Sequence, residues 1–107
     1  MDVFFALAEP TRRQIIELLS SQGQLSASDI SHKFHVSAPA ISQHLKVLRE
    51  AELVQMEKRA QQRIYQINPD KFDELEIWIK QMKQGWEARF DQLDKVLAEE
   101  KQKGGKK

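Results

Sequence analysis

The chain has 107 residues, 40% of them hydrophobic, with a formal net charge of +1 and no cysteine. This size fits one domain with a modest core, which a partner subunit would extend. The missing cysteines exclude disulfides, thiolate metal ligands and a cysteine nucleophile. No apolar run is long enough to cross a bilayer and no secretory leader is recognisable, so we expect a cytoplasmic protein without a membrane partner.

Two short helices are predicted before the middle of the chain. The apolar segment 3–8 is too short to be stable alone and is expected to form one or two turns against another surface. Pro10 at a first helical position and the terminating segment 20–23 bound the next helix. Arg12 and Arg13 lie in its first turn, where the helix dipole disfavours cations. We expect an acidic neighbour to pair with them, and a phosphate contact is the alternative.

Residues 26–51 predict two helices joined by a tight corner. Ser26 and Asp29 match a capping pattern in which a hydroxyl and a carboxylate satisfy free amides of the first turn. The first helix therefore begins at Ser26, with Ile30 and Phe34 facing inward.

The corner between these helices is residues 35–37, with Val36 as an apolar plug. Ser37 is a good N-cap for the second helix, and Pro39 falls in its first turn, where the missing N–H costs nothing.

The second helix has one apolar and one polar face. Ile41, Leu45 and Leu48 recur at helical spacing and face the core. The opposite face is short and polar and suits entry into a major groove, where Ser and Gln contact base edges and Lys contacts a phosphate or guanine. A helical hairpin with a solvated polar face is the alternative, because this geometry also occurs without DNA. The outward residues are Pro39, Ser42, Gln43 and Lys46.

A β-hairpin is predicted after the helix pair. Segments 53–58 and 63–67 favour strands, and the basic, glutamine-bearing segment 59–62 forms the tip. A hairpin directly after a recognition helix is a wing, whose Arg59 and Arg63 can lie on the phosphate backbone or enter the minor groove. The alternative is a solvated edge guarded by charge.

The charge distribution supports nucleic-acid binding only weakly. Residues 22–68 carry six basic against four acidic side chains, whereas residues 69–107 carry nine of each. The basic excess is slight, although it lies in the middle of the chain.

A long helix is predicted from residues 68–70, which combine a cap, a first-turn proline and an early acid. An apolar seam follows over about seven turns and needs a second surface to cover it. Gly85 interrupts the helix and allows a bend, and the tail 101–107 is expected to be disordered. The seam consists of Phe72, Leu75, Ile79, Met82, Trp86, Phe90, Leu93 and Leu97.

Two stretches resemble the ArsR-type winged-helix repressors (the ArsR/SmtB family). Residues 8–13 (AEPTRR) resemble the opening motif of the family. Residues 37–48 (SAPAISQHLKVL) resemble its recognition helix, and residues 51–54 resemble the segment that leads from this helix into the wing. The similarity covers residues 3–68. It implies a homodimeric, sequence-specific transcriptional repressor that binds double-stranded DNA at a palindromic operator. The DNA-binding residues are then Ser37, Ala38, Pro39, Ser42, Gln43, Lys46, Arg59, Gln62 and Arg63, and the dimer interface combines Val3, Phe4 and Leu7 with the seam from Leu75 to Leu97.

The chain departs from the family pattern in places. Glu9 stands where Asp is usual, and His35 occupies a corner position that often carries Gly, so a left-handed backbone with mild strain is expected there. Metal-sensing members carry a Leu-Cys-x-Cys-Asp-Leu motif, where this chain has residues 25–30 (LSASDI). The last helix has no histidine, and its early acids Asp73, Glu74 and Glu76 are expected to be solvated. We therefore expect no metal, no cofactor and a metal-independent branch, with an unknown organic effector left open.

The predicted fold class is mainly α with a small β-hairpin. A single winged helix-turn-helix domain is expected over residues 1–100, comprising dimerisation helices at 1–8 and 70–100, the helix pair at 26–51 and the wing at 52–68. A winged-helix protein-interaction module without DNA binding is the competing function. An enzyme is not expected, because no H-E-x-x-H motif, no Gly-rich phosphate loop and no nucleophile with an oriented base occur.

Overall fold

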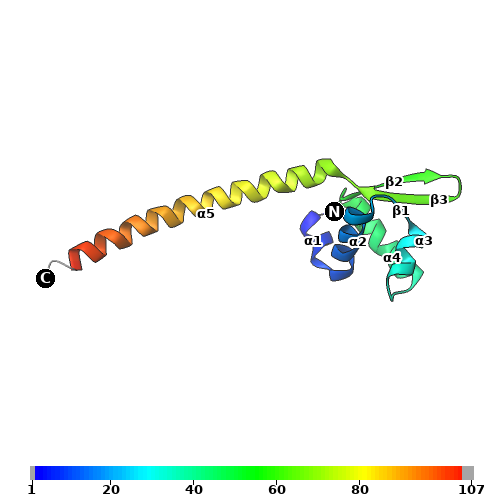
Figure 1. Ribbon diagram of the computed structural model, residues 1–107, viewed down its shortest axis with the longest axis horizontal. Coiled ribbons are helices and arrows are strands. Elements are labelled where there is room, and N and C mark those ends of the chain that lie inside the picture. Colours follow the sequence, from blue (N-terminus) through cyan, green and yellow to red (C-terminus); the bar gives the residue numbers. More distant parts are fainter. Residues whose placement is uncertain (1, 105–107) are drawn as a thin grey trace. The chain divides into compact units, whose positions relative to one another are not determined.

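The computed structural model describes residues 2–104 and confirms the predicted class, mainly helical with a small antiparallel sheet (Figure 1). The chain divides into two compact units, Met1–Phe72 and Asp73–Lys107. The elements in order are α1 (Val3–Ala8), α2 (Pro10–Gln22), β1 (Leu25–Ser26), α3 (Ala27–Lys33), α4 (Ala38–Glu50), β2 (Val54–Arg59), β3 (Gln62–Ile67) and α5 (Pro69–Gly104).

Both helices of the predicted pair begin at the expected caps. The hydroxyl of Ser26 accepts the backbone N–H of Asp29 at 3.0 Å, and that of Ser37 accepts the N–H of Ala40 at 3.3 Å. Pro39 lies in the first turn of α4, as predicted. These bonds satisfy amides that a helix start leaves without partners.

The sheet has three strands in the order β1-β3-β2, all antiparallel. Leu25 and Ser26 form the edge strand β1, in which Leu25 pairs with Tyr65 of β3. The hairpin is tighter than the predicted tip of residues 59–62. Arg59 pairs with Gln62, so two residues, Ala60 and Gln61, connect the strands.

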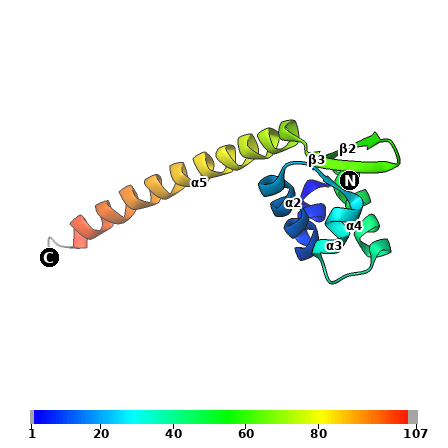
Figure 2. The same ribbon diagram turned by 45° about the vertical axis from the view of Figure 1, so that its right-hand side comes forward.

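Helices α1 to α4 lie on one side of the sheet in two views (Figures 1 and 2). The large side chains fully buried between them are Ile15, Leu19, Ile30, Ile41, Leu45, Leu48 and Leu53. Phe34 is half-buried at the end of α3. The prediction that Val36 plugs the corner is wrong, because this side chain is 40% exposed. Ile30 of α3 and Ile41 of α4 are both fully buried, so the core is closed without the corner residue.

The prediction of a left-handed backbone at His35 in the corner is also wrong. Among the described residues other than glycine, positive φ angles occur at Glu52 (63°) and Ala60 (53°), and not at His35. The corner instead runs in extended conformation on both sides, at Phe34 and Ser37. The two left-handed residues lie where α4 ends and where the wing turns.

From residue 73 to residue 104 the second unit is part of the helix α5. The helix passes through Gly85 without interruption. It continues to Gly104, four residues into the segment for which disorder was predicted, and residues 105–107 lie outside the described part of the chain. Lys and Gln are good helix formers, which explains this extension.

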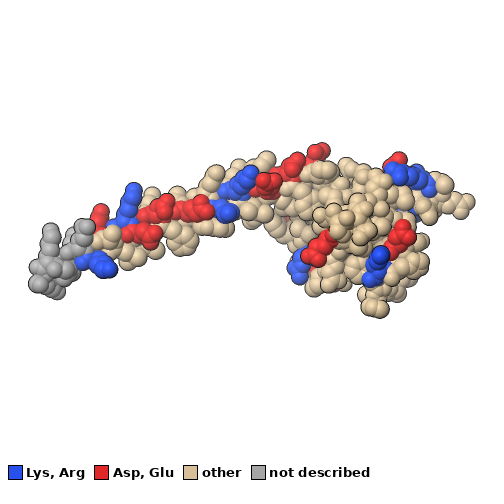
Figure 3. Space-filling view, in the orientation of Figure 1, with Lys and Arg blue, Asp and Glu red and all other residues tan. Residues whose placement is uncertain are grey.

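The apolar side chains of α5 form a seam that is exposed to solvent. From Ile79 to Leu97 the seam residues are between 42% and 60% exposed. Acidic and basic side chains are interspersed along the helix (Figure 3). Within residues 2–104, no helix is long and apolar enough to span a bilayer.

Candidate nucleic-acid interface

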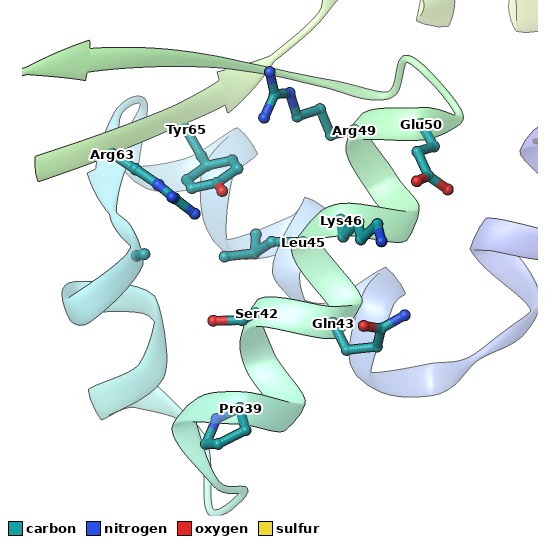
Figure 4. A pocket seen from close by; sticks show the side chains of 10 residues that line it. Pro39, Ser42, Gln43, Leu45, Lys46, Arg49, Glu50, Arg63 and Tyr65 are labelled. Carbon is teal, nitrogen blue, oxygen red and sulfur yellow. The ribbon is translucent and has the colours of Figure 1, made fainter.

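An open hollow of about 670 Å³ lies between α4, the start of α3 and strand β3 (Figure 4). We call it the α4–wing hollow. It brings together four of the predicted DNA-binding side chains on α4 and one on the wing. It is lined by Ala27, Pro39, Ser42, Gln43, Leu45, Lys46, Arg49, Glu50, Arg63 and Tyr65.

The side chains of α4 leave the helix in two directions at this hollow (Figure 4). Ser42 points to the side from which Arg63 and Tyr65 approach. Gln43 and Lys46 point to the other side of the helix. The polar surface of α4 is therefore wide enough to offer hydroxyl, amide and ammonium donors to different parts of one ligand.

The donors around the hollow are not used inside the protein. Within the part of the chain that the structure describes, no side-chain hydrogen bond or ion pair engages Ser42, Gln43, Lys46, Arg49 or Arg63, and all five are exposed. Glu50 is the one acid in the lining and would repel a phosphate.

The wing has two chemically different faces. Lys58 lies directly opposite Arg63 in the strand register, so both belong to the face that carries Arg63 into the hollow. Arg59 lies one position along, on the other face, where its guanidinium contacts the Glu57 carboxylate at 3.0 Å. Like charges directly opposite each other destabilise a sheet unless an anion lies between them. Basic side chains gather over the hairpin with an acid beside them (Figure 3).

The remaining predicted residues lie at the two ends of this surface. Ser37 caps α4, and Gln62 lies at the tip of the wing. Ala38 lines a second, smaller hollow of about 260 Å³ between α3 and α4, together with Ser42 and His32.

Two basic residues of this surface were missed from the sequence. Arg49 follows Lys46 by three positions and Ser42 by seven, so helical spacing alone places it on the same face. The face on which Lys58 lies follows from the register between the strands, because a shift of one position moves a side chain to the opposite face.

The expected pairing of the two arginines at the start of α2 with an acidic side chain is wrong, because neither guanidinium forms an ion pair among the described residues. Arg12 donates from Nε to the carbonyl oxygen of Ala6 at 2.7 Å, and Arg13 donates to that of Leu7 at 3.1 Å. The last carbonyls of a short helix have no partners inside the helix and carry its negative dipole end, so cations suit this place. Both guanidinium groups therefore cap α1.

Glu9 lies beside this junction and caps α2. Its Oε2 accepts the backbone N–H of Arg12 at 3.0 Å and lies 3.9 Å from Nδ1 of His44. Desolvation raises the pKa of the Glu9 carboxyl, but the backbone hydrogen bonds of Arg12 and Thr11 and the charges of His44 and Arg12 outweigh it. The net effect is a pKa below the ordinary glutamate value.

Metal-ligating side chains are scattered. Within the described residues no group of three or more His, Asp or Glu side chains is close enough to hold an ion. Asp73, Glu74 and Glu76 lie on exposed turns of α5.

Sequence comparison places this surface in a known context. Residues 9–56 match the family described as bacterial regulatory protein, arsR family. The transcriptional repressor SdpR of Bacillus subtilis is 36% identical over 78 residues, which cover 73% of this chain and 86% of that protein. The HTH-type transcriptional regulator Rv2034 of Mycobacterium tuberculosis is 45% identical over 64 residues, which cover 60% of this chain and 59% of that protein.

Solved structures give the same picture. An ArsR-like transcriptional regulator from Rhodococcus sp. RHA1 superposes with a TM-score of 0.78 at 26% identity, over 88% of each chain. HlyU from Vibrio cholerae superposes with a TM-score of 0.61 at 30% identity, over 73% of this chain and 85% of that one. Both similarities extend over most of the matched chains.

Proposed function

The chain belongs to the arsR family of bacterial regulatory proteins, and we propose from this premise that it is a DNA-binding transcriptional repressor acting as a homodimer on a palindromic operator. Relatives named as repressors or regulators of transcription support the regulatory role.

The observation that carries the proposal is the set of unused donors at the α4–wing hollow. The same chain engages Arg12 and Arg13 internally but leaves Lys46, Arg49 and Arg63 exposed and without partners among the described residues. In this proposal Ser42 and Gln43 contact base edges, while Lys46, Arg49 and Arg63 neutralise phosphates. Ser37, Ala38 and Pro39 bring the start of α4 to the major groove. At the wing tip, Arg59 and Gln62 lie near the phosphate backbone of the DNA.

The homodimer is supported by the exposed apolar surface. From Ile79 to Leu97 the seam of α5 is about half exposed, which is more apolar surface than a monomeric protein usually tolerates in one stretch, and on α1 Phe4 and Phe5 are half exposed as well. A two-fold dimer would present two recognition helices about 34 Å apart, one turn of DNA, as a palindrome requires.

The test starts from duplexes that the wild-type protein selects from a random-sequence pool. Gln43→Ala should relax the preference at one base pair by about 1–3 kcal/mol, whereas Arg63→Ala should weaken all duplexes alike and reduce the salt slope by about one. Arg13→Ala is the matched control, because among the described residues the Arg13 side chain bonds to the carbonyl oxygen of Leu7 and to no residue of the hollow. Unchanged specificity in Gln43→Ala would contradict our assignment of the base-contacting face.

The competing function is a winged-helix module that binds protein and not DNA. The small basic excess of the chain favours it. A selection in which wild-type protein enriches no duplex sequence, even at low salt, would support that function over ours. Relief of repression is proposed to come from an organic ligand, a partner protein or the protein level, and not from a metal ion.

A further inference from the structure

The side chain of Arg12 connects three helices. It is 9% exposed, and its Nε and NH2 groups donate to the carbonyl oxygens of Ala6 at 2.7 Å and Phe5 at 3.2 Å, both on α1. Its NH1 group lies 3.3 Å from Nδ1 of His44 on α4. One residue of α2 therefore bonds both to the end of α1 and to the recognition helix.

The direction of the contact with α4 follows from chemistry. A guanidinium has only donors, so this contact is a hydrogen bond in the form of His44 whose Nδ1 carries no proton and accepts. Oε2 of Glu9 lies 3.9 Å from the same nitrogen and also accepts the backbone N–H of Arg12. Nδ1 of His44 therefore faces both the guanidinium of Arg12 and the carboxylate of Glu9, at the junction of α1 and α2.

No other side-chain hydrogen bond or ion pair links α4 to α1 or α2 within the described residues. The rest of the contact is apolar, through Ile41, Leu45 and Leu48 against the core. Apolar packing is not directional, whereas a hydrogen bond has a preferred angle and so constrains the rotation of a helix. The hydrogen bond to His44 supplies the missing direction.

We propose that Arg12 and His44 are positioning residues for DNA recognition: their hydrogen bond fixes the rotation of α4 against α1 and α2 and so couples the α1 surface to DNA affinity. This inference rests on the proposed function. His44 directly follows Ser42 and Gln43 in α4, so a rotation at His44 moves both. Because the same guanidinium binds carbonyl oxygens of α1, a displacement of α1 also moves the group that contacts His44.

The experiment measures affinity for a duplex that the wild-type protein selects from a random-sequence pool. His44→Leu removes the acceptor and should weaken binding by about tenfold at a temperature where circular dichroism shows the variant folded. His44→Asn places an amide oxygen near the position of Nδ1 and should restore most of the affinity. Arg13→Leu is the matched control, because it removes an arginine that caps the same helix but does not reach α4.

A double-mutant cycle separates positioning from direct contact with DNA. If His44 acts through Arg12, then Arg12→Lys combined with His44→Leu should bind no more weakly than the worse of the two single variants. Additive losses would mean that His44 contacts DNA itself and would overturn the proposal. Losses that follow the folded fraction in every variant, or wild-type affinity in His44→Leu, would overturn it as well.

The proposed function fails differently. If the wild-type chain enriches no duplex, DNA binding is wrong and the positioning role falls with it. If the wild-type chain binds a selected duplex and His44→Leu binds it equally well, the repressor assignment stands and only the role of Arg12 and His44 is wrong.

Discussion

Leu53 donates its backbone N–H to the carbonyl oxygen of Leu48 at 3.0 Å, and this bond closes the end of the recognition helix before the wing begins. The N–H of Glu52 bonds to the carbonyl of Arg49 at the same distance, and both leucines are fully buried. Together these features form a Schellman motif, in which the residue between helix and exit is left-handed. Glycine is the usual occupant of that position, but this chain has Glu52, with φ 63°.

The first prediction concerns the strain at Glu52. Glu52→Gly should raise the free energy of unfolding by about 0.5–1 kcal/mol, because glycine adopts positive φ without a Cβ clash. The loss of the exposed contact between Glu52 and Lys71, 3.7 Å long, should cost little. Urea denaturation measures the change. The control is Glu50→Gly in the last turn of α4, which should destabilise, and a loss of stability in both variants would show that Glu52 is not strained.

The second prediction distinguishes the two faces of the wing. Lys58→Ala should weaken binding to every duplex and reduce the slope of log affinity against log salt by about one, because it removes one phosphate contact. Arg59→Ala should change the slope less, since its guanidinium lies on the other face and pairs with Glu57. Fluorescence anisotropy over a salt series gives both slopes. Equal slopes in the two variants would show that DNA does not distinguish the faces.

Much of this arrangement is predictable from local sequence. Caps, prolines and apolar spacing locate α2, α3, α4 and the wing, because these signals act within one or two turns. The errors concern contacts over longer range. The carbonyl partners of Arg12 and the exposure of Val36 depend on how separate helices meet, and the face of Lys58 depends on the register between strands.

The third prediction concerns acid pH and Glu9. A carboxyl whose pKa is lower in the folded state stabilises the fold above its unfolded pKa, about 4.3, and loses that contribution as pH falls through the folded value. Glu9→Gln should therefore be less stable than wild type near neutral pH, and the difference should shrink below about pH 4. Thermal melts across pH measure this. Glu17→Gln, on an exposed position of the same helix, is the control. A difference that stays constant with pH would exclude a role for the charge of Glu9.

The fourth prediction tests the dimer. Trp86→Glu should give a monomeric mass by ultracentrifugation at micromolar concentration, because a charge in an apolar seam cannot be buried without a partner. The variant should also lose DNA affinity, although Trp86 does not line the α4–wing hollow. Gln84→Glu introduces the same charge on the opposite side of α5 and should behave as wild type. A monomeric wild-type protein that still binds DNA would rule out the proposed homodimer.

The last prediction is that metal ions do not release the protein from DNA. Sequence relatives include arsenical resistance operon repressors, among them one from Staphylococcus xylosus that is 39% identical over 67 residues. This chain has no cysteine, and at the place of the family's cysteine motif it carries Ser26, whose hydroxyl caps α3, and Ser28. Hydroxyls stay protonated at neutral pH and are poor ligands for soft ions.

The measurement is a titration of zinc, cadmium and arsenite into the complex of the protein with its selected duplex, with chelator controls. Affinity should change by less than about twofold with each ion, because no thiolate is available and the histidines lie on α3, α4 and their connection. His32→Gln tests for ions bound adventitiously on α3. A stoichiometric ion that shifts the affinity by about tenfold, equivalent to about 1.4 kcal/mol of coupling, would make the protein a metal sensor with ligands other than cysteine.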